Sequence, residues 1–84
     1  MEIHYGPSFM RAYRKLPVEI INTLEAKVEI FKNDPWDPVL RRHSLRGHLR
    51  GFSAFSITYR YRAMFKIVEG RVVFVDIGTH DIYD

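Results

Sequence analysis

The chain has 84 residues, 46% of them hydrophobic and 14% aromatic, which is enough for one small domain with a core and excludes a disordered chain. It has no cysteine, which excludes disulfides, zinc-thiolate sites and thiol catalysis. The net charge is +3, and residues 38–68 contain no acidic side chain. We expect a single domain over residues 1–84.

The beginning of the chain, MEIHYGPSF, lacks the apolar core of a signal peptide. The longest apolar stretch is also far shorter than the ~20 residues that a membrane span needs. We therefore expect a cytoplasmic protein with no membrane partner.

Residues 2–5 alternate weakly and predict a short strand, which a Gly-Pro pair ends. Ser8 is in position to cap a helix that runs to about Leu16. Pro17 breaks this helix and can occupy the first turn of the next one.

Residues 18–32 show the clearest helical pattern in the chain. Their apolar positions recur at intervals of three, four and seven, at Ile20, Ile21, Leu24, Val28 and Phe31. The sequence Asn-Asp-Pro ends the helix, and a loop is expected to about residue 38. Within that loop, Trp36 is expected to plug the open end of the core rather than to stack on a base.

The second half of the chain predicts three strands, over residues 52–58, 62–68 and 71–77. Residues 59–61 form the first bend, and Glu69-Gly70 is typical of a two-residue hairpin turn. In the middle strand, alternation places Ala63, Phe65 and Ile67 on one face and Arg62, Met64 and Lys66 on the other.

These elements predict an α+β fold in the order β-α-α-β-β-β. Tight turns make the last three strands antiparallel, and the two helices bury their apolar stripes on one face of this small antiparallel sheet. The result is a two-layer domain. Its other sheet face stays open and carries Arg62 and Lys66.

A basic block lies between the last acid of the N-terminal part and the first acid of the C-terminal part. It comprises Arg41, Arg42, Arg46, Arg50, Arg60, Arg62 and Lys66, together with His43 and His48. Such a field attracts phosphodiester backbones or acidic proteins. A solvated basic face that serves solubility is the alternative, and the absence of interspersed acids argues against it.

Histidines near these cations suggest cleavage of RNA. Histidine can act as acid or base near neutral pH, and arginine binds phosphate through two parallel hydrogen bonds. His80 follows Gly78 after a hydrophobic strand, where a side chain can project into an open site, and Tyr83 is close enough to stack on a base. The alternatives are structural histidines and an aromatic ring clamped over the core. The spacing predicts no metal site and no cofactor.

The segments HSLRGHLRGF, YRAMFKI and VVFVDIGTHDIY, in this order, resemble the C-terminal half of RelE/ParE superfamily toxins, especially the RelE/StbE and YafQ-like branches. The N-terminal pattern is also similar, so the resemblance covers nearly the whole chain. It implies two helices on a small antiparallel sheet and a cognate antitoxin as partner. It also implies cleavage of mRNA in the ribosomal A site, with contacts to rRNA.

The resemblance implies roles for four residues. His43 matches a catalytic histidine of YafQ-like toxins, and Arg62 matches the arginine that contacts the scissile phosphate. His80 matches the catalytic histidine of the terminal G-x-H motif, and Tyr83 matches the aromatic residue that stacks on the substrate base. The RNA-binding candidates are Arg41, Arg42, Arg46, His48, Arg50, Arg60 and Lys66.

The sequence also departs from that pattern. Ser56 and Arg60 stand where YafQ-like toxins carry a second catalytic histidine and an aspartate. Tyr83 follows His80 by three residues, where several members have four. Two other functions stay open: a ParE-like toxin that inhibits DNA gyrase without cutting nucleic acid, and a nonenzymatic RNA-binding relative.

Overall fold

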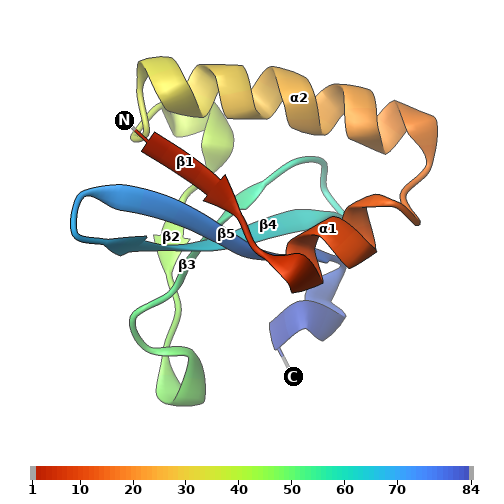
Figure 1. Cartoon of the computed structure of the whole chain (residues 1–84). Helices are drawn as coiled ribbons and strands as arrows, with labels where there is room; N and C mark the ends of the chain where they lie inside the picture. Colours follow the sequence, from red (N-terminus) through yellow and green to blue (C-terminus); the bar gives the residue numbers. More distant parts are fainter. Residues whose placement is uncertain (1, 84) are drawn as a thin grey trace.

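The structure, a computed structural model, describes residues 2–83 and consists of two helices packed on a five-stranded sheet (Figure 1). This confirms the predicted α+β class. The main elements are β1 (Glu2–Tyr5), α1 (Pro7–Tyr13), α2 (Val18–Asn33), β2 (His43–Ser44), β3 (Ser53–Ser56), β4 (Arg62–Val68) and β5 (Arg71–Gly78). Three short 3-10 turns complete the fold: η1 (Pro38–Leu40), η2 (Gly47–Leu49) and η3 (His80–Tyr83).

The sheet has the order β1-β5-β4-β3-β2. The antiparallel pairing of β3, β4 and β5 is confirmed, because tight turns permit no other direction. The prediction of a wholly antiparallel sheet was wrong, since β1 pairs with β5 in parallel. Both helices lie between these two strands in the chain, and a crossover of that length allows parallel pairing. The added edge strand β2 has two residues, too few to show alternation.

Helix α1 begins at Pro7, one residue before the predicted cap. Gly6 is the capping residue, and its N–H donates to the Phe74 carbonyl at 2.8 Å, which prolongs the β1–β5 ladder. Proline at the first helical position has the required φ and lacks an N–H that would otherwise need a partner. Ser8 therefore lies inside the helix, where its hydroxyl accepts from Arg11 instead of capping.

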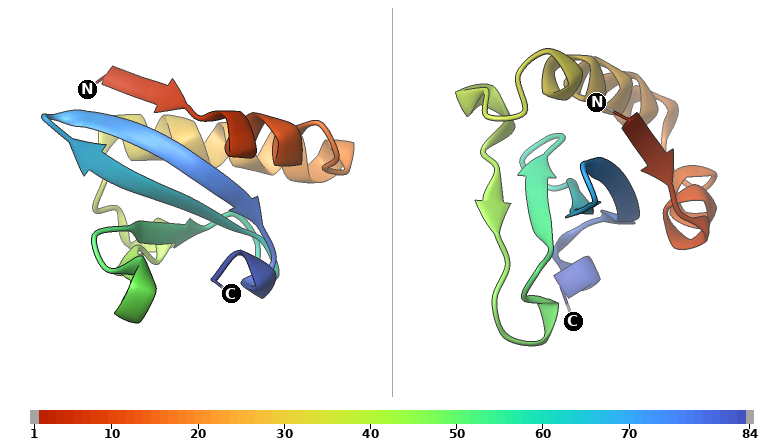
Figure 2. Two further views of the ribbon diagram at one scale, coloured as in Figure 1. Left: turned by 60° about the horizontal axis from the view of Figure 1, so that its bottom comes forward. Right: turned by 60° about the vertical axis from the view of Figure 1, so that its left-hand side comes forward.

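The core lies between the helices and one face of the sheet (Figure 2). Its centre is a cluster of aromatic rings, with Phe31 of α2 at centroid distances of 5.1 to 5.9 Å from Phe55, Phe65 and Phe74. Aromatic pairs at these distances contribute beyond the area they bury. Phe9 of α1 completes the cluster. Both helices are thus held on the same face, and neither α1 nor α2 covers the opposite face, on which η3 lies (Figure 1).

A bulge in β5 changes which side chains face the core. Met64 pairs with Asp76 and Phe65 with Phe74, so Val75 has no partner on β4. The extra residue lets both Phe74 and Ile77 point toward the helices, although their odd spacing would separate them in a regular strand.

The β4–β5 hairpin turns at Glu69 and Gly70, as predicted. Both residues have left-handed φ values, 52° and 78°, which are typical of the type I′ turn that joins antiparallel strands. Near this turn Ile67 is 53% exposed, against the expectation that it joins Ala63 and Phe65 in the core. The tip of the hairpin, which Ile67 precedes by two residues, projects past the helices (Figure 1).

Within residues 2–83, no helix is both long enough and apolar enough to cross a membrane.

Candidate nucleic-acid site on the open sheet face

The sheet face away from α1 and α2 is called the open face, because neither helix covers it. It carries the side chains that alternate with the core residues, and at its centre Ala54 and Met64 are buried. Paired strand positions share a face, and the row His43, Ala54, Met64 and Asp76 crosses four strands on the side away from the helices. A second row joins Ser56, Arg62 and Gly78. The sequence thus correctly placed Arg62 on the open face, and His43 reaches that face from the edge strand.

The Arg62 guanidinium is held by backbone carbonyls of the β3–β4 turn. Its Nη1 donates to the oxygens of Thr58 at 2.8 Å, Tyr59 at 2.7 Å and Tyr61 at 3.2 Å. Within residues 2–83, Nη2 and Nε have no hydrogen-bond partner. A guanidinium fixed through one nitrogen can still present its remaining N–H groups to an anion.

Tyr83 lies near both candidate histidines. Its ring centroid is 6.4 Å from that of His43 and 6.3 Å from that of His80, both in edge-on geometry. Burial raises the pKa of Tyr83, and the charge of Arg62 partly opposes this increase. Among the described residues, its buried hydroxyl has no hydrogen-bond partner. These four residues are called the His–Tyr–Arg cluster below.

Turn η3 brings His80 and Tyr83 to this position. The chain leaves β5 at Gly78, where a Cβ atom would lie 2.8 Å from Ile82 Cγ2. A larger residue at position 78 would force the Ile82 side chain to move, and η3 folds back at this point on the side of the sheet away from α2 (Figure 1). The structure thus brings together the four candidates that the sequence named as catalytic.

The remaining basic candidates other than Arg42 are exposed on the segments before and after β2 and β3 or, like Lys66, lie farther along β4. Arg46, His48 and Arg50 are exposed on the loop that contains η2, which projects on the same side as η3 (Figure 1). Arg41 is exposed before β2, and its carbonyl oxygen lies 3.3 Å from His43 Nδ1. Arg60 is exposed in the β3–β4 turn, next to the residues that hold Arg62.

Arg42 is the exception, because it points away from the open face. Its guanidinium lies 3.7 Å from the centroid of Trp36 and 5.2 Å from that of Phe65, on the helix side of the sheet. It also donates to the Pro35 carbonyl at 3.4 Å, and burial lowers the pKa of Arg42. Trp36 is 70% exposed, so the prediction that it plugs the core was wrong. Leu40 takes that buried position instead.

The open face continues to the opposite end of the sheet, where sequence reasoning missed His4 and Arg71. The parallel β1–β5 pairing places His4 beside Val73, which pairs with Lys66. A hollow of about 380 Å³ lies there, lined by His4, Lys66, Val68, Arg71 and Val73. Alternation in residues 2–5 could have indicated which side His4 faces, but not that β1 would lie beside β5.

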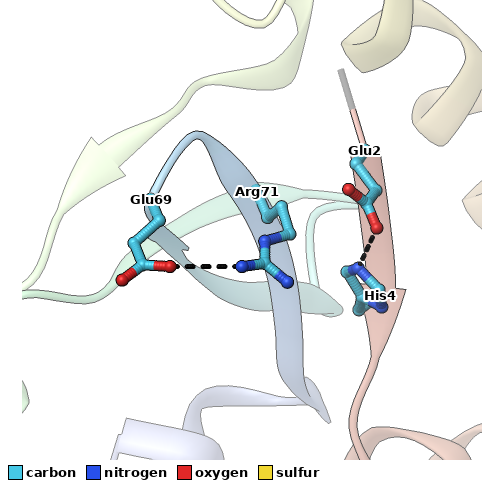
Figure 3. Close-up of polar contacts among 4 residues, drawn as sticks. All are labelled: Glu2, His4, Glu69 and Arg71. Atoms are coloured by element: carbon cyan, nitrogen blue, oxygen red, sulfur yellow. Dashed lines mark hydrogen bonds and ion pairs between the residues drawn. The ribbon is translucent and has the colours of Figure 1, made fainter.

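Local ion pairs offset part of the positive charge at this end. His4 Nε2 lies 2.7 Å from a carboxylate oxygen of Glu2, and Arg71 Nη2 lies 3.2 Å from one of Glu69 (Figure 3). None of the ion pairs among residues 2–83 involves Arg62 or Lys66. Arg62 and Lys66 on β4 therefore keep their charge available to an anionic partner.

The helix side of the molecule carries a second hollow. A groove of about 490 Å³ lies between α1 and α2, with Phe9, Leu24 and Val28 in its lining and Glu25 and Glu29 as acidic neighbours. It contains none of the residues that the sequence named as catalytic. Within residues 2–83, no three His, Asp or Glu side chains are grouped in a way that could hold a metal ion.

No family model matches the chain, and no curated protein sequence matches it. Solved structures do match. YafQ from Escherichia coli BL21(DE3) has a TM-score of 0.82 at 18% identity, over 96% of this chain and 94% of that one.

Two further structures agree. A YoeB/ParE toxin from Agrobacterium tumefaciens has a TM-score of 0.80 at 15% identity, over 95% of this chain and 99% of that one. YafQ in the E. coli DinJ–YafQ toxin–antitoxin complex has a TM-score of 0.68 at 19% identity, over 96% and 93%. The chain therefore has the fold of the YafQ and YoeB/ParE toxins, as its resemblance to the RelE/ParE superfamily predicted.

Proposed function

We propose that this protein is the toxin of a toxin–antitoxin pair and acts as a ribosome-dependent endoribonuclease that cuts mRNA in the A site. The observation that carries the proposal is the His–Tyr–Arg cluster, which gathers two histidines, an arginine and an aromatic ring on an open cationic face. The likeness in fold to YafQ and to a YoeB/ParE toxin supports the same assignment. Such a toxin works in the cytoplasm, where ribosomes translate.

The proposed reaction needs no group beyond those of the chain and the RNA. One histidine of the pair His43 and His80 removes the proton of the 2′-hydroxyl, and the 2′-oxygen forms a bond to phosphorus. The bond from phosphorus to the 5′-oxygen breaks, and the other histidine protonates that oxygen. The products are a cyclic phosphate and a 5′-hydroxyl. Acid and base catalysis of this kind contributes about 10²- to 10⁴-fold.

Arg62 and Tyr83 position the substrate in this proposal. Because carbonyl oxygens hold Nη1 of Arg62, its other N–H groups are available to the scissile phosphate, whose negative charge grows in the transition state. The ring of Tyr83 stacks on a base next to the scissile bond. Because its ring centroid lies within 6.4 Å of both histidine rings, a base stacked on it would bring that bond near both.

The cognate antitoxin is the second proposed partner. An open face with a run of cations suits an acidic segment that folds upon it and covers the cluster. The DinJ–YafQ complex, in which a protein of this fold is bound to another protein, supports a partner of this kind. Together they would form an inactive heteromeric complex.

Primer-extension mapping on a translated mRNA tests the proposal. The wild type is expected to produce cuts linked to codons in the A site. The double variant Arg62→Ala and His80→Ala is expected to reduce them by at least ~10³-fold, because it removes a phosphate ligand and a proton carrier together. Absence of cuts with the wild type, or undiminished cuts with the double variant, would defeat the proposal. Inhibition of purified gyrase in a supercoiling assay would then point to a ParE-like activity.

A further inference from the structure

The segment between α2 and β2 presents an exposed aromatic ring that the proposed cleavage reaction does not use. Trp36 is 70% exposed, and the Arg42 guanidinium covers one side of its indole at 3.7 Å. A large apolar ring turned toward water costs free energy unless something binds it, and tryptophan is the best of the aromatic residues at binding cations and bases. We propose that Trp36 is a stacking platform for an unpaired RNA base, and this rests on the proposed function.

The ring is held in place before any ligand arrives. The backbone N–H of Trp36 donates to Asp34 Oδ1 at 3.0 Å, and prolines stand on both sides at positions 35 and 38. Arg42 is fixed in turn by the Pro35 carbonyl at 3.4 Å. A prearranged ring loses little conformational entropy when a base stacks on it. Arg42 is thus a positioning residue, which explains why this cation alone leaves the open face.

The platform lies close to the His–Tyr–Arg cluster along the chain. Strand β2 is at the edge of the sheet, and His43, the first residue of β2, directly follows Arg42. Neighbouring residues in an extended chain point to opposite faces, so His43 lies on the open face and Arg42 behind it. Figure 2 shows the segment before β2 at this outer edge. An RNA strand that leaves the cluster across β2 would pass Arg41 and then reach Trp36.

Charge favours RNA over a protein as the occupant. Residues 38–68 carry cations and no acid, and exposed Arg41 stands between Trp36 and His43 in the chain. The nearby carboxylates of Asp34 and Asp37 each accept a backbone N–H, from Trp36 and Val39. A protein contact centred on a tryptophan normally has a ring of further apolar contacts. In segment 34–42, which the structure describes fully, Val39 is the one other exposed large hydrophobic residue, too few to form such a ring.

Trp36 is the only tryptophan of the chain, so its fluorescence reports directly on stacking. The test titrates the full-length protein with a mixed-sequence single-stranded RNA of twelve nucleotides, end-labelled so that anisotropy measures binding independently. Inorganic polyphosphate, which has the charge but no bases, is the control. RNA is expected to quench the Trp36 emission as the anisotropy rises, and polyphosphate is expected to leave the emission unchanged.

Three variants separate stacking from mere contact. Trp36→Leu keeps an apolar side chain without a ring and is expected to weaken RNA binding about tenfold, within the usual range for one stacked base. Trp36→Phe keeps a ring and is expected to stay within about threefold of the wild type. Arg42→Gln is expected to lower the anisotropy of the Trp36 emission in the free protein, because the ring is no longer held. Circular dichroism checks that each variant is folded.

The inference is overturned if RNA does not bind, if it binds without changing the Trp36 emission, or if Trp36→Leu and Trp36→Phe bind alike. An unchanged emission would mean that Trp36 serves a protein contact instead. Binding does not require cleavage, so the two proposals can fail separately. Quenching by RNA without codon-linked cuts would remove only the proposed nuclease activity, and cuts without quenching would remove only the stacking platform.

Discussion

The two faces of the sheet are built from the same strands but obey different constraints. On the helix side, Phe31, Phe55, Phe65 and Phe74 are 0% exposed and pack ring against ring. On the open side, Arg62 and Lys66 are partly exposed, and hydrogen bonds to backbone hold Arg62. The helix side contributes to stability through close packing of its rings. The open side depends on the charge and the fixed geometry of its polar side chains. Substitutions on the two faces should therefore change different measured quantities.

The largest effect on stability is expected at the centre of the helix side. Phe31→Ala should lower the free energy of unfolding by about 3 to 5 kcal/mol, because it leaves a cavity among three other aromatic rings. Urea unfolding followed by circular dichroism measures this, and the milder Phe31→Leu serves if the alanine variant is unfolded. Tyr59→Ala, at a side chain 84% exposed, should change stability by less than about 0.5 kcal/mol. Equal losses at both positions would contradict the contrast between buried and exposed rings.

A large effect on cleavage with a small effect on folding is expected on the open side. Arg62→Ala should reduce codon-linked cleavage by about 10²- to 10³-fold, the usual result of removing one donor to a developing charge. Arg62→Lys should recover only part of this, because an ammonium cannot bind the turn carbonyls and a phosphate in the same fixed geometry. The matched control is Arg14→Ala, an exposed arginine that follows α1. If Arg14→Ala lost as much cleavage, net charge rather than position would be responsible.

The comparison also shows what the sequence can predict. Features set by neighbouring residues were predictable: the bounds of β1, the start of α2, the Glu69-Gly70 turn and the open-face position of Arg62. Alternation, helical periodicity and turn preferences are local signals. The grouping of His43 with His80 and Tyr83 came from a resemblance, since the pattern of residues alone says nothing about contacts between distant segments.

Features set by distant contacts were missed for the same reason. The parallel pairing of β1 with β5 brings His4 beside Val73, which no local pattern encodes. The bulge at Val75 changes the phase of β5 without a glycine or proline to mark it. Arg42 lies in a run of cations, yet it turns back to Trp36 because an indole ring is near enough to cover.

Tyr83 combines the burial that is typical of the helix side with a position on the open face, because its hydroxyl is buried there. Tyr83→Phe should raise the free energy of unfolding at pH 7 by roughly 1 kcal/mol, since the removed hydroxyl has no hydrogen-bond partner among the described residues. Cleavage should stay within a few-fold, because the ring remains. Chemical denaturation of both proteins measures the difference. A loss of more than 1 kcal/mol would mean that the hydroxyl is hydrogen-bonded in solution.

The raised pKa of Tyr83 adds a pH dependence with a definite sign. Burial favours the neutral phenol in the folded state, so the folded protein keeps this proton to a higher pH than the unfolded chain. The contribution of Tyr83 to the free energy of unfolding is complete below pH 10.0, the pKa of tyrosine in the unfolded chain. It is lost as the pH rises through the higher pKa of Tyr83 in the folded protein. The wild type should therefore lose more stability above pH 10 than Tyr83→Phe. Parallel stability curves for the two proteins would contradict this assignment.

The smallest expected effect is a change in RNA affinity when one lysine is removed from the open side of the sheet but not when one is removed from the helix side. Lys66 on β4 and Lys32 at the end of α2 carry the same charge, but Lys66 lines the hollow on the open face and Lys32 lines the groove between the helices. Lys66→Ala should weaken binding of single-stranded RNA several-fold and reduce the salt dependence by about one counterion, because one phosphate contact is lost.

Lys32→Ala removes the same charge from the other side and should change neither quantity measurably. Long-range attraction by net charge would affect the two variants equally, whereas a phosphate seated on β4 depends only on Lys66. Titrations of labelled RNA at several salt concentrations distinguish these cases. If the RNA affinities of the two variants depended equally on salt concentration, the net charge of the whole molecule would attract RNA. The open face would then not be the binding site of the strand.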